Sequence, residues 1–284
     1  MVKYYAFAGL EIGVQAPDDR IYEDEWMLAP FAVREATDPH LFRFRFCEEL
    51  KAPAGKLLMQ EPAFFVYEEE DATVRYLGKL QTSWQQAYAR IERRGRETVV
   101  YLKNEIYPNR ITAKTVLNCI AAEHLSVQAG GVVFHSSYID HRGDGILFTA
   151  PSGTGKSTQA DLWEKFRGAE IVNGDRSVVR ATEDGVFACG IPFAGSSSYC
   201  KNKTLPLKAI VYLKQAPVTT IRRLRGTEAF RRIWEGCSVN AWDKQDMALA
   251  SETVLRVLET VPVFELACTP DESAVLALEG VLRA

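Results

Sequence analysis

A glycine-rich segment, Ala150–Thr158 (APSGTGKST), constrains the fold more than any other part of this chain. It follows an apolar run, Gly145–Thr149, that predicts a buried strand, and it precedes residues 159–166, which predict a helix. Glycines at positions 153 and 155 let the backbone curl around an anion, so that successive N–H groups and the helix N-terminus face it. The segment is therefore predicted to be a phosphate-binding loop between a strand and a helix.

The loop carries the side chains that bind a nucleotide with Mg²⁺. Lys156 can reach the outer phosphates, and the Ser157 hydroxyl is placed to ligate a magnesium ion shared with them. The strict pattern GxxxxGK[ST] requires glycine where Ala150 stands, but the core SGTGKST is intact. A glycine- and serine-rich turn without function is the less favoured alternative. The residues expected to contact the nucleotide are Ser152, Gly153, Thr154, Gly155, Lys156, Ser157 and Thr158.

Charge and cysteine content exclude several classes of protein. The chain of 284 residues has 34 basic and 37 acidic side chains, so neither a nucleic acid nor a membrane surface is expected as the main partner. The six cysteines lack CxxC or Cys/His spacing, so a zinc site is not expected. We expect neither a signal peptide nor a membrane span, because no apolar run approaches the ~20 residues that span a bilayer. We expect a cytoplasmic protein.

Residues 1–110 are predicted to form a mostly-β module that acts in recognition or packing. The segment Leu41–Phe46 alternates aromatic and arginine side chains, which predicts a strand with Phe42, Phe44 and Phe46 on its core face. Short strands joined by turns predict a small antiparallel sheet. Further strands are expected at Ala63–Tyr67, Thr73–Leu77, Ser83–Ile91 and Thr98–Leu102.

Residues 111–130 predict a connecting helix, because apolar side chains from Val116 to Val127 recur with a helical period until Gly130 ends the pattern. His124 lies on this apolar stripe and is more simply a buried core histidine than a ligand. Residues 131–284 then form the domain that contains the phosphate loop.

Two titratable residues are expected near that loop. His135 lies on a strand predicted to form a hairpin with the strand that enters the loop, and Glu170–Asn173 predicts a short strand that leads to Asp175. A carboxylate at a strand end beside a phosphate site suits a magnesium ligand or a catalytic base. A histidine of ordinary pKa is also a competent base near neutral pH. The alternatives are a turn aspartate beside Gly174 and a buried histidine that joins two strands.

Two further segments could take part in phosphate binding. Residues 188–203 are rich in glycine, serine and lysine, as in loops that hold phosphates or close as lids, and a surface connection is an equal alternative. Residues 219–233 are rich in arginine, which usually marks a solvated surface, although one guanidinium could reach a γ-phosphate. These arginines are Arg222, Arg223, Arg225, Arg231 and Arg232.

The chain resembles the HPr kinase/phosphorylase family in three motifs, which are His135 on its strand, the loop Ser152–Ser157, and Gly174–Asp175–Arg176. It is most similar to the smaller members described as HPr-kinase-related serine kinases. The resemblance implies an α/β fold, in which a phosphoenolpyruvate-carboxykinase-like P-loop domain follows the β module. It implies ATP and Mg²⁺ as cofactors, Ser157 and Asp175 as metal ligands, and His135, Asp175 and Lys156 as catalytic residues. Because the family is hexameric, a homo-oligomer is compatible with it.

One departure from the family bears on the reaction. Gly174 stands where the family has a first aspartate, which is implicated there as the base that activates the acceptor hydroxyl. The favoured prediction is an ATP- and Mg²⁺-dependent phosphotransferase that acts on a hydroxyl of a protein serine or a small molecule. The alternative is a nucleotide-binding regulatory module with weak or no kinase activity. A transporter-type ATPase is disfavoured, because the LSGGQ signature is absent.

Overall fold

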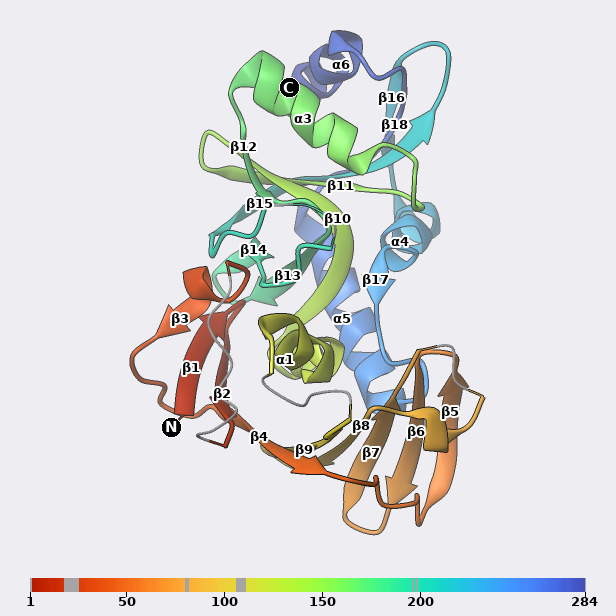
Figure 1. Ribbon diagram of the computed structural model, residues 1–284. Helices are drawn as coiled ribbons and strands as arrows, with labels where there is room; N and C mark the ends of the chain where they lie inside the picture. The colour runs from red at the N-terminus through yellow and green to blue at the C-terminus, as the bar shows by residue number, and fades with distance from the viewer. Residues whose placement is uncertain are drawn as a thin grey trace. The chain divides into compact units, whose positions relative to one another are not determined.

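The computed structural model describes residues 2–17, 26–79, 82–105, 111–195, 197 and 199–283. The chain divides into two compact units (Figure 1). Unit 1 comprises Met1–Ala6 and Leu10–Ala121, and unit 2 comprises Phe7–Gly9 and Ala122–Ala284. Each unit is built around one large sheet, and the described residues place nine strands in each. The protein is therefore a mixed α/β protein with two large sheets.

The sheet of unit 1 runs in the order β3–β1–β2–β4–β9–β8–β7–β6–β5. Its strands are β1 (Val2–Phe7), β2 (Leu10–Gln15), β3 (Ala32–Val33), β4 (His40–Cys47), β5 (Lys56–Glu61), β6 (Phe64–Glu69), β7 (Ala72–Leu77), β8 (Ala89–Arg94) and β9 (Glu97–Lys103). The expected antiparallel sheet is wrong in part, because β4 pairs in parallel with both β2 and β9. Parallel neighbours need a long connection, and here whole strands or a long segment intervene between the paired elements.

The aromatic strand behaves largely as its alternation predicts. Phe42 and Phe44 are 1% and 2% exposed, whereas Phe46, near the end of β4, is only half-buried. Two short 3₁₀ helices, η2 (Ala29–Phe31) and η3 (Trp84–Gln86), interrupt the strands. The expected strand at 83–91 therefore begins only at Ala89, after η3.

The single helix expected over residues 111–130 is two short helices, α1 (Ala113–Cys119) and α2 (Ala122–Gln128). Thr112 begins α1 by accepting a hydrogen bond from the Thr115 N–H, and α1 ends at Ile120, which is extended (φ −71°, ψ 124°). Ile120 is buried at the break, so the hydrophobic period does not distinguish two helices from one. Unit 1 contains α1 and unit 2 contains α2.

The sheet of unit 2 runs in the order β11–β10–β13–β14–β15–β18–β16, with β12 and β17 added against β10. Its strands are β10 (Gly131–His141), β11 (Asp144–Thr149), β12 (Glu170–Asn173), β13 (Arg176–Thr182), β14 (Gly185–Gly190), β15 (Thr204–Gln215), β16 (Thr220–Leu224), β17 (Cys237–Ser238) and β18 (Val263–Cys268). The expected hairpin of β10 and β11 is confirmed. Because β11, β15 and β18 run in parallel, their carboxyl ends meet at one edge of the sheet.

Helices cover both faces of this sheet (Figure 1). They are α3 (Lys156–Arg167) and α6 (Glu272–Leu282) in one apolar core, and α4 (Gly226–Trp234) and α5 (Lys244–Thr260) in the other. In β15, Val211 and Leu213 face α3 and α6, whereas Ile210 faces the opposite core, as the strand period requires. Asp271 is the N-cap of α6, and its side chain accepts a hydrogen bond from the Ser273 N–H.

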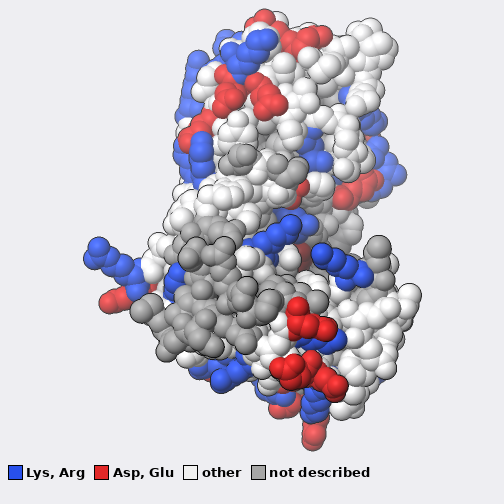
Figure 2. Space-filling model, viewed as in Figure 1, with Lys and Arg blue, Asp and Glu red and all other residues white. Residues whose placement is uncertain are grey.

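The surface and the cysteines agree with the composition. On the face shown in Figure 2, the described basic and acidic side chains are interspersed. All six cysteines are free thiols. Among the described helices, none combines the length and the apolar character needed to cross a bilayer.

Candidate functional site

The phosphate loop connects β11 to α3, as the sequence predicts. Gly153 (φ 78°) and Gly155 (φ 117°) have left-handed backbone, which side chains rarely adopt, and Gly155 is the N-cap of α3. Positive φ at described non-glycine residues is confined to Ala8 and Arg142. Ala150 therefore has a backbone conformation open to any residue, and its replacement of the usual glycine leaves the loop intact.

Lys156, the first residue of α3, is 8% exposed. Its Nζ donates hydrogen bonds to the backbone oxygens of Ala150 (3.0 Å) and Pro151 (3.5 Å). Burial lowers the pKa of Lys156, and the charge of Asp175 opposes that shift. The other loop residues predicted to contact the nucleotide are exposed or half-buried, so a ligand can reach the loop. They are Ser152, Gly153, Thr154, Gly155, Ser157 and Thr158.

A buried asparagine fixes the turn that carries Asp175. Asn173 Oδ1 accepts hydrogen bonds from the backbone N–H groups of Asp175 (2.9 Å) and Arg176 (3.0 Å). Its Nδ2 donates to Ile191 O at 2.9 Å, and the residue is fully buried. Sequence reasoning missed this role, although an asparagine just before Gly174–Asp175 is the signal of an Asx turn.

His135 and Asp175 meet across the sheet. His135 on β10 is paired in register with Arg176 on β13, which brings His135 Nε2 to 3.4 Å from Asp175 Oδ1. Hydrogen bonding with His135 is the largest cause that lowers the pKa of Asp175; burial opposes it, and the charges of Arg176 and Lys156 add to it. Asp175 is therefore ionised at neutral pH. His135 and Asp175 thus lie together, and the charges of Asp175 and Lys156 act on one another.

The space beside Gly174 is already filled. A Cβ built at Gly174 would lie 2.5 Å from Cβ and Oγ of Ser197, and one at Gly195 would lie 2.5 Å from Asp175 Cγ. The segment that contains Gly195 and Ser197 therefore packs directly on the Asp175 turn. Ser196 and Ser198, which belong to the same predicted loop, lie outside the described residues.

Most of the basic side chains proposed as phosphate contacts have acidic partners. Lys201 and Lys203 lie 2.8 and 2.6 Å from the carboxylate of Glu170. Three of the five clustered arginines form ion pairs, Arg222 with Glu228 and Glu265, and Arg231 and Arg232 with Glu235. These contacts favour a structural role for both segments.

His124 has a partner of its own. Its Nδ1 lies 2.9 Å from Oδ1 of Asp246, which is 1% exposed and also accepts a hydrogen bond from Asn240. Burial would raise the pKa of Asp246, but the bonds from His124 and Asn240 lower it overall. The pair joins α2 to α5, as expected of a histidine in the core. With Asp243, which caps α5 through two backbone N–H groups, these residues lie close enough to hold an ion, but their oxygens already accept hydrogen bonds.

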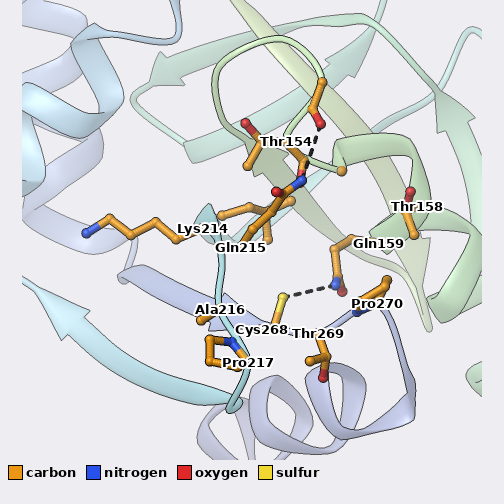
Figure 3. Close-up of a pocket in the computed structure, with 13 residues that line it drawn as sticks. Thr154, Thr158, Gln159, Lys214, Gln215, Ala216, Pro217, Cys268, Thr269 and Pro270 are labelled. Carbon is orange, nitrogen blue, oxygen red and sulfur yellow. Dashed lines mark hydrogen bonds between the residues drawn. The ribbon is translucent and has the colours of Figure 1, made fainter.

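A cavity of about 620 Å³ adjoins the phosphate loop (Figure 3). It lies where β15 and β18 end, at the sheet edge where parallel α/β sheets bind ligands. Gln215 donates weak hydrogen bonds from Nε2 to the oxygens of Gly153 (3.5 Å) and Thr154 (3.4 Å), and so connects the end of β15 to the loop. Sequence reasoning did not identify Gln159, Gln215 or Cys268 in this wall, because only the pairing of distant strands brings them together.

No family model and no curated protein matches the chain. Among solved structures, it resembles the Hpr(Ser) kinase/phosphatase from Coxiella burnetii, with 12% identity over 53% of this chain and 88% of that chain, at a TM-score of 0.33. Because that TM-score is low, function is inferred from the geometry of the site alone.

Proposed function

We propose that unit 2 binds ATP with Mg²⁺ at the loop Ala150–Thr158 and transfers the γ-phosphoryl group to a hydroxyl acceptor. The observation that carries this proposal is the contact of His135 with Asp175, whose charge also acts on Lys156 at the start of the helix that follows the loop. Phosphoryl transfer needs a cation for the phosphates, a carboxylate for the metal and a group that accepts the acceptor's proton. The acceptor is a serine of a protein or a small-molecule alcohol.

Lys156 and the loop amides would bind the phosphates. Lys156 Nζ is held by two neutral carbonyl oxygens, and phosphate oxygens form stronger, charge-assisted hydrogen bonds with an ammonium group. A triphosphate would therefore replace these carbonyls as the partners of Nζ.

Ser157 and Asp175 fit a Mg²⁺ ion, because hydroxyl and carboxylate oxygens are the hard ligands that it prefers. Ser157 lies at the surface, and the lowered pKa of Asp175 keeps its carboxylate ionised. When bound, Mg²⁺ would neutralise charge on the β- and γ-phosphates.

His135 is suited to accept the proton of the acceptor hydroxyl. Because Nε2 faces Asp175, the Nε2–H donates to the carboxylate and Nδ1 is left as the proton acceptor. In the transfer step the acceptor O–H bond breaks and its proton moves to Nδ1, while the oxygen forms a bond to the γ-phosphorus. The bond from that phosphorus to the bridging oxygen breaks, and ADP leaves with the bonding electrons. Asp175 would stabilise the protonated imidazole.

A steady-state assay of ADP release, with and without candidate hydroxyl acceptors, tests the proposal. We expect release that depends on both an acceptor and Mg²⁺. Asp175→Asn preserves the shape of the side chain and removes its charge, so the Mg²⁺ dependence should weaken. Asp161→Asn, at an exposed position of α3, is the matched control. If Asp175→Asn leaves the Mg²⁺ dependence of ADP release unchanged, Asp175 has only a structural role in the turn.

One observation favours the alternative, a nucleotide-binding regulatory module. Ser197 fills the space beside Gly174, and among the described residues 173–176 of that turn Asp175 supplies the only carboxylate. Such a module would bind ATP at the loop without acceptor-dependent ADP release. The same assay, combined with calorimetric ATP binding, distinguishes the two functions.

A further inference from the structure

The cavity beside the phosphate loop has a partly apolar wall, which phosphate binding does not explain. Apolar side chains form much of its wall, in contrast to the polar loop next to it (Figure 3); they are Leu213, Ala216, Pro217 and Pro270. Its volume of about 620 Å³ is in the range of sites for small organic ligands. A flat heteroaromatic ring attached to the bound phosphates would fit such walls.

Gln159 is the buried polar side chain of this wall. It is 3% exposed, and its Nε2 donates to Cys268 Sγ at 3.3 Å (Figure 3). Its Oε1 is buried and has no hydrogen-bond partner among the described residues. An amide oxygen that loses water on folding without gaining a donor costs free energy, so a donor from the cavity side would recover that loss.

Gln159 also lies on the same face of α3 as Lys156 of the loop. It follows Lys156 by three residues on α3, and positions three apart lie on one face of a helix. Both side chains are buried. The first turn of α3 can therefore bind the phosphates with Lys156 and another part of the same ligand with Gln159.

We propose that the cavity holds the base of the nucleotide, and that Gln159 Oε1 accepts a hydrogen bond from the base's amino group, which selects adenine over hypoxanthine. This inference rests on the proposed binding of a nucleoside triphosphate at the loop. Adenine presents an amino donor at its 6-position, where hypoxanthine presents a carbonyl oxygen. An acceptor would then face the Gln159 oxygen, and sites built to hydrogen-bond a group reject analogues that lack it.

Calorimetry with Mg²⁺-ATP, Mg²⁺-ITP and inorganic tripolyphosphate tests the inference. For the wild type we expect ATP to bind roughly three- to tenfold more tightly than ITP, the ratio that one hydrogen bond provides. Gln159→Met conserves volume and removes the acceptor, so ATP and ITP should then bind equally well. Tripolyphosphate affinity should be unchanged in this variant. Gln245→Met, the same substitution at an exposed position of α5, should behave as the wild type.

The outcomes separate this inference from the function on which it rests. Tripolyphosphate binding with equal affinity for ATP and ITP in the wild type would overturn the base site and leave the phosphate site standing. A preference for ATP that survives in Gln159→Met would overturn the role of Gln159. Failure of tripolyphosphate and both nucleotides to bind would overturn the proposed function itself. The wild-type comparison decides the question even where Gln159→Met does not fold.

Discussion

Arg90 in unit 1 and Lys156 in unit 2 are both buried cations, 1% and 8% exposed, but their partners differ. Arg90 lies between two carboxylates, with Nε 2.7 Å from Glu92 and a terminal nitrogen 2.9 Å from Glu69. Lys156 is held by two neutral backbone oxygens. Two carboxylates neutralise the charge of Arg90 by direct contact, whereas the hydrogen-bond acceptors of Lys156 Nζ are uncharged and Asp175 acts on it only through its charge.

The pKa shifts of Glu92 and Lys156 reflect this difference between charged and uncharged partners. Burial alone would raise the pKa of Glu92, but hydrogen bonds from Arg94 and Arg90 lower it, so the unit 1 network stays ionised. For Lys156 burial is the main cause, and it lowers the pKa. A buried charge without an opposite charge costs stability, and such groups mark functional sites. The comparison agrees with a structural role for Arg90 and with the phosphate-binding role proposed for Lys156.

Removing Arg90 should produce the largest effect. Arg90→Met would remove the ion pair of Glu69 and leave Glu92 with Arg94 alone; breaking a buried ion pair typically destabilises a protein by about 3–5 kcal/mol. Urea unfolding of unit 1 measures the change. Arg96→Met, which breaks an exposed pair with Asp38, is the control and should have little effect.

The same variants test whether Arg90, unlike Lys156, has no part in ATP binding. ATP affinity should be unchanged in folded Arg90→Met, because the described partners of Arg90 all belong to unit 1. A loss of ATP binding at temperatures where the variant is folded would contradict a purely structural role.

His135→Asn should lower acceptor-dependent phosphoryl transfer by about a hundredfold or more, the contribution of a general base. Its side chain is 40% exposed, so the fold and the ATP affinity should be preserved. Single-turnover measurements of phosphoryl transfer, with calorimetry of ATP binding, give both quantities. Full transfer activity in His135→Asn would mean that the histidine only contacts Asp175 and that the base lies elsewhere.

Lys156→Ala should weaken ATP binding by about ten- to a hundredfold, since charge-assisted hydrogen bonds contribute about 1.5–3 kcal/mol. Unlike the removal of Arg90, the removal of Lys156 breaks no buried ion pair, so the free energy of unfolding should change much less. Calorimetry and thermal unfolding measure the two effects. Lys165→Ala, near the end of the same helix, is the control. An unchanged ATP affinity would refute the phosphate assignment.

Local patterns predicted the elements around the phosphate loop, because the hairpin of β10 and β11 and the start of α3 depend on neighbouring residues. The parallel pairs of β4 were missed, since the strands that flank it come from distant parts of the chain. The same reason hid the approach of His135 to Asp175 and of Ser197 to Gly174. Motif spacing indicates which residues can bind phosphate, but only the pairing of strands shows which of them meet.

The smallest expected effect is on the rate of phosphoryl transfer when a carboxylate is introduced at Gly174. It tests whether the site in unit 2 would gain from a second carboxylate beside Asp175. Gly174→Asp alone should not raise turnover, because its Cβ would meet Ser197 at 2.5 Å and displace the segment that packs on Asp175. Combined with Ser197→Gly, the new carboxylate has room beside Asp175. Transfer should then rise a few-fold over Ser197→Gly alone, a modest gain because His135 already serves as base. An equal rise with Gly174→Asp alone would contradict the packing of Ser197, and no rise in the pair would favour the regulatory module over the kinase.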